Sequence, residues 1–124
     1  MADKKRIIII EDDDMILAMY KTKLEQDGYE VITATNGIDG IEVSSKNKAD
    51  IILLDIIMPG LDGFSVLEDL RKNKGITKTP IVLLTNLGTE EDKEKGQELG
   101  AAGYLVKASL TPAQVSAEIK KYLK

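Results

Sequence analysis

The 124-residue chain contains no cysteine, no histidine and no tryptophan. Without cysteine it can form neither a disulfide framework nor a thiolate metal site. The protein is therefore compatible with a reducing compartment. Without histidine it has no Ser-His-Asp triad, no imidazole metal ligand and no histidine that could carry a phosphoryl group. Carboxylates, hydroxyls and amines remain as the groups able to do chemistry.

A positive charge balance and long apolar runs are also missing. With 17 Lys and Arg against 21 Asp and Glu, the net charge is −4, so direct binding to nucleic acid or an anionic membrane is not expected. The first apolar run, Ile7–Ile10, is too short for a signal peptide, and no stretch approaches a membrane span. We expect one cytoplasmic domain over residues 1–124, with no linker and no output domain.

Short apolar runs alternate with segments of helical periodicity along the chain. This alternation predicts an α/β fold with a parallel sheet and helices on both faces. The run 51–54 is apolar at every position, as in a strand buried on both sides. The expected strands cover 7–10, 30–35, 51–54, 81–85 and 104–106, and the expected helices cover 14–27, 38–46, 64–73, 90–99 and a last helix capped by Thr111.

The last two helices carry distinct local signals. Thr111-Pro112-Ala113-Gln114 fits a capping box with proline at the first helical position, and Val115, Ile119 and Leu123 form the expected buried stripe. The helix over 90–99 is highly charged and contains Gly96, so we expect it to be among the less stable elements.

Four of the five expected strands end in chemically useful side chains. These are Glu11-Asp12, Asp55, Thr85 and Lys107. Because the carboxyl ends of parallel strands share one edge of the sheet, these side chains should meet in one crevice. Three carboxylates there would repel each other unless a cation neutralised them. One divalent metal and Lys107 bring the sum to zero, and all-oxygen ligation suits Mg²⁺.

Four motifs in this order resemble those of a known family. They are Ile-Glu-Asp at 10–12, Leu-Asp-Ile-Ile-Met-Pro-Gly-Leu-Asp-Gly at 54–63, Leu-Leu-Thr at 83–85 and Gly-Tyr-Leu-Val-Lys at 103–107. Over its whole length the chain is similar to the receiver domain of a two-component response regulator, of the single-domain chemotaxis type. This resemblance implies a flavodoxin-like doubly wound (βα)5 fold with strand order 2-1-3-4-5.

The resemblance also implies a mechanism. Asp55 would accept a phosphoryl group from a sensor histidine kinase or a histidine phosphotransfer protein. Mg²⁺ would be held by Glu11, Asp12, Asp55 and the backbone carbonyl of Ile57. Such a protein is a phosphoacceptor that assists its own phosphorylation and dephosphorylation, rather than an enzyme.

Two further positions would read out phosphorylation. These are Thr85 and Tyr104, with Tyr104 turning inward as Thr85 shifts. Thr85 and Lys107 would also bind phosphoryl oxygens. The face of the fourth helix, fifth strand and fifth helix would then bind an unknown protein target, with the chain a monomer or weak dimer.

Some positions depart from the commonest family pattern. Ala108 follows Lys107 where the family usually has proline, so that peptide is either cis at a cost of roughly 2.5–4 kcal/mol or trans. Asn86 stands where the family prefers a small residue, alanine or serine. Ile57 and Leu87 are apolar where some members carry groups that position water, which predicts slow self-dephosphorylation.

Other interpretations remain open from the residues alone. Asp55 could be an ordinary turn aspartate, and Asp13 and Asp14 read more simply as helix N-terminal charges than as ligands. Asp12-x-Asp14 mimics the motif of a haloacid-dehalogenase-like phosphatase. A receiver-like interaction module that is never phosphorylated is a further alternative. A nucleotide-binding flavodoxin-like domain is disfavoured, because no Gly-rich phosphate loop follows the first strand.

Overall fold

The computed structural model describes residues 4–86 and 88–123, and five strands alternate with five helices along them. The strands are β1 (Arg6–Ile10), β2 (Glu30–Ala34), β3 (Ile51–Leu54), β4 (Ile81–Thr85) and β5 (Gly103–Val106). The helices are α1 (Asp14–Gln26), α2 (Gly37–Lys46), α3 (Gly63–Lys72), α4 (Glu90–Glu98) and α5 (Pro112–Lys120), and a 3-10 turn, η1, covers Lys107–Ser109.

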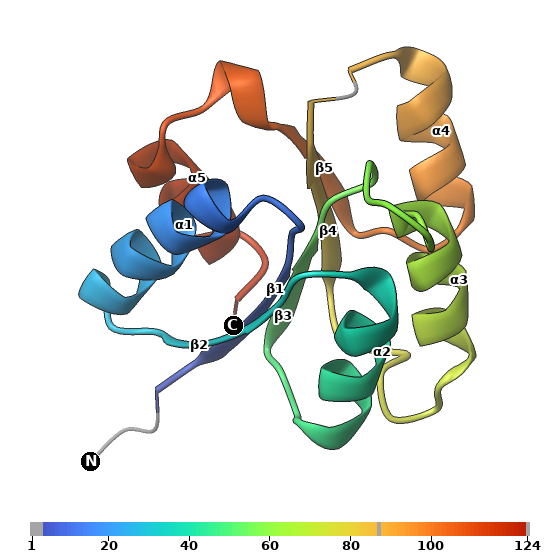
Figure 1. The fold of residues 1–124 in the computed structure, drawn as a ribbon, viewed down its shortest axis with the longest axis horizontal. Helices are drawn as coiled ribbons and strands as arrows, with labels where there is room; N and C mark the ends of the chain where they lie inside the picture. Colours follow the sequence, from blue (N-terminus) through green and yellow to red (C-terminus); the bar gives the residue numbers. More distant parts are fainter. Residues whose placement is uncertain (1–3, 87, 124) are drawn as a thin grey trace.

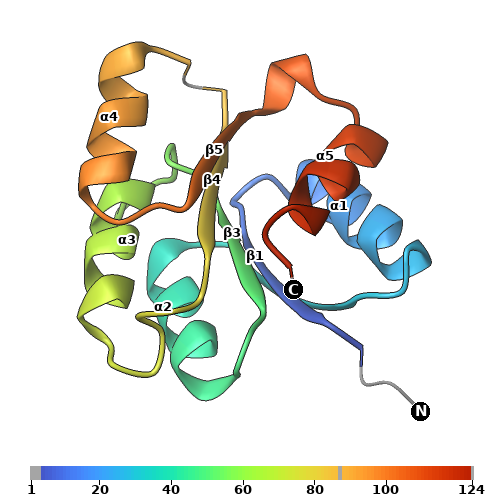
Figure 2. The same cartoon turned by 180° about the vertical axis from the view of Figure 1, so that it is seen from behind.

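All five of these strands are parallel and lie in the order β2-β1-β3-β4-β5. Helices α1 and α5 cover one face of the sheet, and α2, α3 and α4 cover the other (Figure 1). The view from behind shows the same two layers (Figure 2). The predicted doubly wound fold and its strand order are confirmed.

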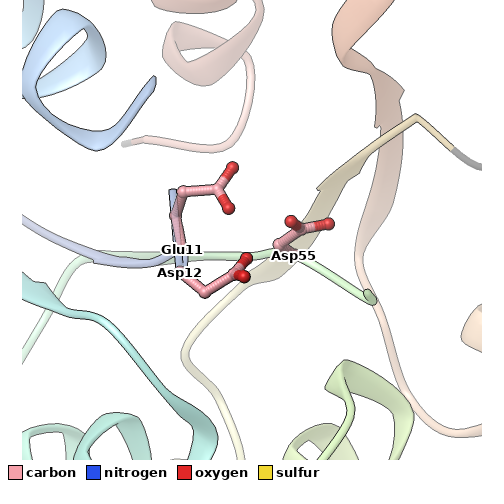
Figure 3. Close-up of side chains that lie close together, drawn as sticks. All are labelled: Glu11, Asp12 and Asp55. Carbon is pink, nitrogen blue, oxygen red and sulfur yellow. The ribbon is translucent and has the colours of Figure 1, made fainter. Parts of the chain in front are cut away.

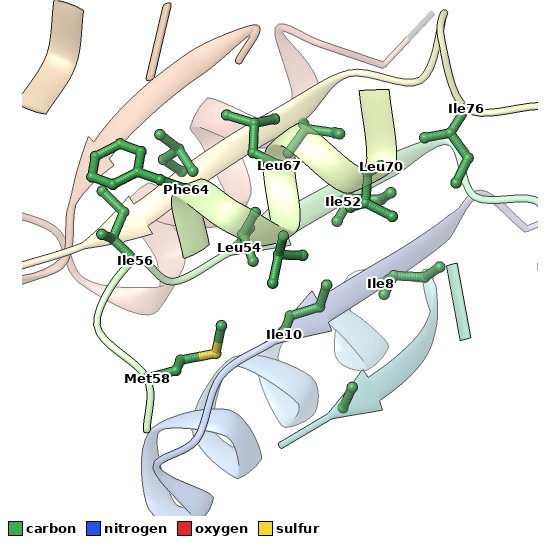
Figure 4. Packing of buried hydrophobic residues seen from close by; sticks show 14 residues of the cluster. Ile8, Ile10, Ile52, Leu54, Ile56, Met58, Phe64, Leu67, Leu70 and Ile76 are labelled. Carbon is green, nitrogen blue, oxygen red and sulfur yellow. The ribbon is translucent and has the colours of Figure 1, made fainter. Parts of the chain in front are cut away.

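Alternation along the buried strands explains why they are apolar at every position. On one face, Ile8, Ile10, Ile52 and Leu54 pack against the apolar side of α3 (Figure 4). On the other, their neighbours Ile7, Ile9, Ile51 and Leu53 pack against α1 and α5. Because both faces are covered, a charged side chain fits only where a strand leaves the core.

Polar caps fix where several helices begin. Asp13 caps α1, its carboxylate accepting the amides of Met15 and Ile16 at 3.0 Å each. Asp62 caps α3 by accepting the Ser65 amide at 2.9 Å. The predicted capping box of α5 is present: the Thr111 amide donates to Gln114, and the Gln114 amide donates to Thr111.

Three details differ from the sequence-based expectation. Ile38, an apolar residue at the start of the predicted helix 38–46, is 70% exposed. Leu123 lies beyond α5, which ends at Lys120, although it still packs against the core. Gly96 is buried in α4, and a Cβ there would come within 2.5 Å of Leu83 Cδ1, so glycine permits close helix–sheet packing.

Within the described residues, no helix combines the length and apolarity needed to cross a membrane.

Candidate phosphoryl-acceptor site

Glu11 and Asp55 stand at neighbouring strand ends. The Glu11 amide donates to Ala34 O, and the Asp55 amide donates to Ile10 O, both at 3.0 Å, so each residue extends the sheet by one position. The two residues are only 4% and 6% exposed, whereas Asp12 is exposed. The fold therefore buries two carboxylates side by side.

Glu11, Asp12 and Asp55 form the acidic cluster of this edge. One carboxylate oxygen from each lies within 4.8 Å of the others. Figure 3 shows Glu11 and Asp12 reaching from the end of β1 toward Asp55. The ligands are all hard oxygens and Asp12 opens the cluster to solvent, so the residues present fit a Mg²⁺ ion that keeps several waters.

Lys107 brings a positive charge into the same crevice from the far end of β5. Its ammonium group donates a hydrogen bond to Glu11 Oε1 and another to Asp55 Oδ2, the latter at 3.1 Å. The Lys107 side chain is 9% exposed, so these are buried ion pairs. When all three carboxylates are ionised, one ammonium leaves two uncompensated negative charges, which a divalent cation would neutralise.

Burial and charge shift the ionisation of both partners. Burial raises the pKa of Glu11 to about 7; the hydrogen bond from Lys107 opposes this rise, and the Asp55 carboxylate adds to it. Burial lowers the pKa of Lys107, but the hydrogen bond to Glu11 and the charge of Asp55 outweigh it and raise that pKa. Lys107 therefore stays charged at neutral pH.

Local backbone contacts orient the two buried carboxylates. The Asp13 amide donates to Glu11 Oε2 at 3.3 Å, and the Ile57 amide donates to Asp55 Oδ1 at 3.4 Å. Ile57 is 58% exposed, so this residue turns its backbone toward Asp55 and its side chain to solvent. Asp13 serves as a cap and Asp14 as a first-turn acid, as expected.

Gly63 is a site-positioning residue whose role sequence reasoning missed. A Cβ at this position would lie 2.2 Å from Asp55 O and 2.6 Å from Ile56 Cα. Only glycine lets the start of α3 lie directly against the backbone that carries Asp55. In the sequence, Asp62-Gly63 indicates no more than a helix entry, because its contact with Asp55 depends on the third dimension.

The remaining predicted positions lie around this cluster. Thr85 is the fully buried last residue of β4 and pairs in register with Val106, next to Lys107. Tyr104 is half-buried on β5. The Lys107–Ala108 peptide is trans. Asn86 is exposed, and Leu87 lies outside the described residues.

The family model of the response regulator receiver domain matches residues 7–120. The chain belongs to the response regulator receiver family. It is therefore a receiver domain of the kind found in two-component systems.

Relatives of known sequence agree with this family. The chain is 38% identical over 120 residues to the alkaline phosphatase synthesis transcriptional regulatory protein PhoP of Bacillus subtilis, covering 97% of this chain and 49% of that protein. It is 37% identical to the probable transcriptional regulator ycf27 of Cyanophora paradoxa, covering 98% of this chain and 49% of the relative. The receiver thus spans about half the length of these relatives.

Solved structures of receivers have the same fold. The chemotaxis protein CheY4 of Vibrio cholerae superposes with a TM-score of 0.93 at 30% identity, covering 98% of this chain and 100% of that one. The BeF3-activated N-terminal receiver domain of RstA from Klebsiella pneumoniae gives a TM-score of 0.88 at 32% identity, covering 97% and 99%.

Proposed function

We propose that this receiver accepts a phosphoryl group on Asp55. The observation that carries the proposal is the position of that carboxylate. It is buried at the carboxyl end of the central strand, hydrogen-bonded to Lys107, and within 4.8 Å of oxygens from Glu11 and Asp12. A structural turn aspartate would need neither a buried lysine nor two further acids.

In the reaction, one Asp55 oxygen attacks the phosphorus of a phosphoryl group bound to nitrogen. The new O–P bond forms as the P–N bond breaks, and the electron pair leaves on nitrogen, which takes up a proton. The product is an acyl phosphate on Asp55. The protein contributes mainly positioning and charge, because phosphoryl transfer needs little covalent help.

Mg²⁺ would be held by Glu11, Asp12, Asp55 and the Ile57 carbonyl. Bound there, it would supply positive charge that offsets the negative charge of the transferring phosphoryl group. Lys107 would contribute a positive charge at another phosphoryl oxygen, and the Thr85 hydroxyl would donate to a third. The buried charges of Lys107 and Asp55 and the buried strand-end position of Thr85 support these assignments.

The switch would act through α4, β5 and α5. Among the described residues of α4, Gly96 alone is buried, so little apolar contact fixes this helix to the sheet. The turn that follows α4 is tied down, since Arg71 Nε donates to Gly100 O at 2.9 Å. Tyr104 borders a pocket against Lys93 and Gln97 of α4. A shift of Thr85 and Tyr104 would therefore bias a weakly held helix.

A sensor histidine kinase or a histidine phosphotransfer protein is the proposed phosphodonor, and the receiver would work in the cytoplasm as a monomer or weak dimer. Three exposed apolar side chains belong to segments that start at the edge carrying Asp55. Met15 is 84% exposed, Ile38 70% and Ile57 58%. They support docking of an apolar helix surface around the acidic crevice.

The deciding experiment is intact-mass analysis after incubation with phosphoramidate, with and without Mg²⁺. The wild type should gain one phosphoryl group only with Mg²⁺, and Asp55→Asn should gain none. Asp13→Asn is the matched control, because Asp13 is a neighbouring acid that acts as a cap, and it should be phosphorylated normally. An unmodified wild type would overturn the proposal in favour of a non-phosphorylated interaction module.

A further inference from the structure

Lys95 of α4 lies over an aromatic ring of α3. Its ammonium nitrogen is 4.5 Å from the centroid of the Phe64 ring, which is within the range of a cation–π contact. Glu91 and Glu98 stand one turn before and one turn after Lys95 on the helix, where ion pairs commonly form. In the part of the chain that the structure describes, neither acid is paired with Lys95. The lysine charge therefore serves a contact between two helices rather than one within α4.

Phe64 belongs to the turn of α3 that touches the backbone of the proposed acceptor. It follows Gly63, whose amide donates to Ile56 O at 2.8 Å and whose missing side chain leaves room for Asp55 O. The Phe64 ring is 9% exposed and lies at one end of the apolar cluster between α3 and the sheet (Figure 4). One residue thus separates the ring from the contact with the backbone that carries Asp55.

Few other contacts hold α4 in place. Gly96 is its one buried residue among those described, and a Cβ there would come within 2.5 Å of Leu83 Cδ1, so α4 lies close to β4 at this point. Leu99, directly after the helix, packs against the core. An exposed cation–π contact changes an equilibrium by about twofold to fivefold. For a helix with so little buried surface, that factor is a substantial part of what fixes its position.

We propose that Lys95 is a positioning residue that couples α4 to the backbone of Asp55 through the Phe64 ring. This route passes through neither Thr85 nor Tyr104, and the inference rests on the proposed function. The contact forms while Asp55 is unmodified, so it stabilises the arrangement of α4 that precedes phosphorylation. Removing the contact should therefore favour the arrangement that phosphorylation selects.

The first test measures phosphorylation in Lys95→Gln, Lys95→Arg and Lys72→Gln. Glutamine at 95 removes the cation, whereas arginine keeps a cation over the ring. Lys72→Gln makes the same charge change at an exposed lysine of α3. With phosphoramidate and Mg²⁺, we expect the rate constant to rise about twofold to fivefold for Lys95→Gln and to match wild type for the other two variants. An unchanged rate in Lys95→Gln, or an equal rise in Lys72→Gln, would overturn the coupling.

A metal-free readout tests the contact without phosphorylation. By NMR, amide hydrogen exchange of residues 93–99 should be about twofold to fivefold faster in Lys95→Gln and unchanged in Lys95→Arg and Lys72→Gln. Phe64→Leu keeps an apolar side chain at the buried position but removes the ring face, so it should accelerate exchange of the same amides. With Phe64→Leu and Lys95→Gln combined, the two effects should be non-additive, because both remove one contact.

The outcomes distinguish this inference from the proposed function. If the wild type is not phosphorylated, the proposed function fails and the coupling to Asp55 fails with it, whereas faster exchange in Lys95→Gln would still support the hold of Lys95 on α4. If exchange in Lys95→Gln matches wild type, or if the effects of Lys95→Gln and Phe64→Leu simply add, the contact does not position α4 and the inference is overturned.

Discussion

The ammonium group of Lys107 lies 3.1 Å from Asp55 Oδ2 and also binds Glu11, although Lys107 is 52 residues from the first and 96 from the second. One buried cation thus holds together the ends of β1, β3 and β5. Because Asp55 is the proposed phosphoacceptor and Glu11 a proposed metal ligand, the same contact sets both the stability and the reactivity of the site.

Removing the lysine charge should make the protein depend on metal for stability. In Lys107→Met, two buried carboxylates lose their partner, and the free energy of unfolding without metal should fall by about 3 kcal/mol. Mg²⁺ should then raise the free energy of unfolding of Lys107→Met by more than it raises that of the wild type. Urea unfolding with EDTA or with Mg²⁺ measures both effects, and an equal Mg²⁺ increment in the two proteins would contradict this charge balance.

The raised pKa of Glu11 should make metal binding depend on pH. With a pKa of about 7, Glu11 is mostly protonated at pH 6 and mostly ionised at pH 8. Mg²⁺ binds the ionised form, so the apparent dissociation constant should fall roughly tenfold between these pH values. Titration calorimetry in buffers of different ionisation enthalpy would also detect the released proton. The same affinity at pH 6 and pH 8 would show that Glu11 is ionised throughout.

The same shift predicts how stability varies with pH in the absence of metal. Glu11 has a pKa of about 7 in the folded protein and 4.5 as its ordinary value, so the folded state binds the proton more tightly. The free energy of unfolding should therefore fall as pH rises from about 4.5 to about 7. Glu11→Gln should flatten this slope and raise stability at pH 8 by about 1–2 kcal/mol. Urea unfolding of metal-free protein across this range is the measurement, and an unchanged slope in Glu11→Gln would assign the dependence to other groups.

Gly63→Ala should damage both folding and phosphorylation. Its Cβ would come within 2.2 Å of Asp55 O, which is backbone and cannot move without shifting β3. We expect a loss of about 2–3 kcal/mol of stability and slower phosphorylation of the protein that remains folded. Gly60→Ala is the matched control: Gly60 has φ +77° but nothing lies within 4 Å of the place its Cβ would take, so only backbone strain of about 1 kcal/mol is expected. Equal losses of stability in Gly63→Ala and Gly60→Ala would show that the contact with Asp55 does not cause the effect.

Replacing Ile57 should change how long the phosphoryl group persists. Ile57 is 58% exposed two residues beyond Asp55, where its side chain offers water no hydrogen bond. Ile57→Asn adds a polar group that can orient an attacking water, so dephosphorylation should accelerate severalfold. The decay of phosphorylated protein by intact mass tests this, with Ile57→Leu as the apolar control. A decay rate that is the same for asparagine and leucine would remove Ile57 from the control of lifetime.

The sequence by itself determined the order of elements and the chemistry at the strand ends. The fully apolar run Ile51–Leu54 requires cover on both faces of its strand, and parallel strands require a common carboxyl edge. Asp55 and Lys107 each follow a strand of the same parallel sheet, so their proximity could be predicted without coordinates. The capping box at Thr111 depends only on residues close in sequence, so it too could be predicted from the sequence.

Only the tertiary structure decided which side chains touch. Tyr20 recurs at helical spacing with Leu17 and Leu24, yet only the packing of α1 puts its ring beside Glu11 and Asp55. Ile38 kept the helical period but faces solvent, because the sheet lies under the glycine side of α2. Gly63 looked like a turn residue until its distance to Asp55 was known. Periodicity fixes which residues share a side of an element, whereas the rotation and spacing of packed elements fix what that side meets.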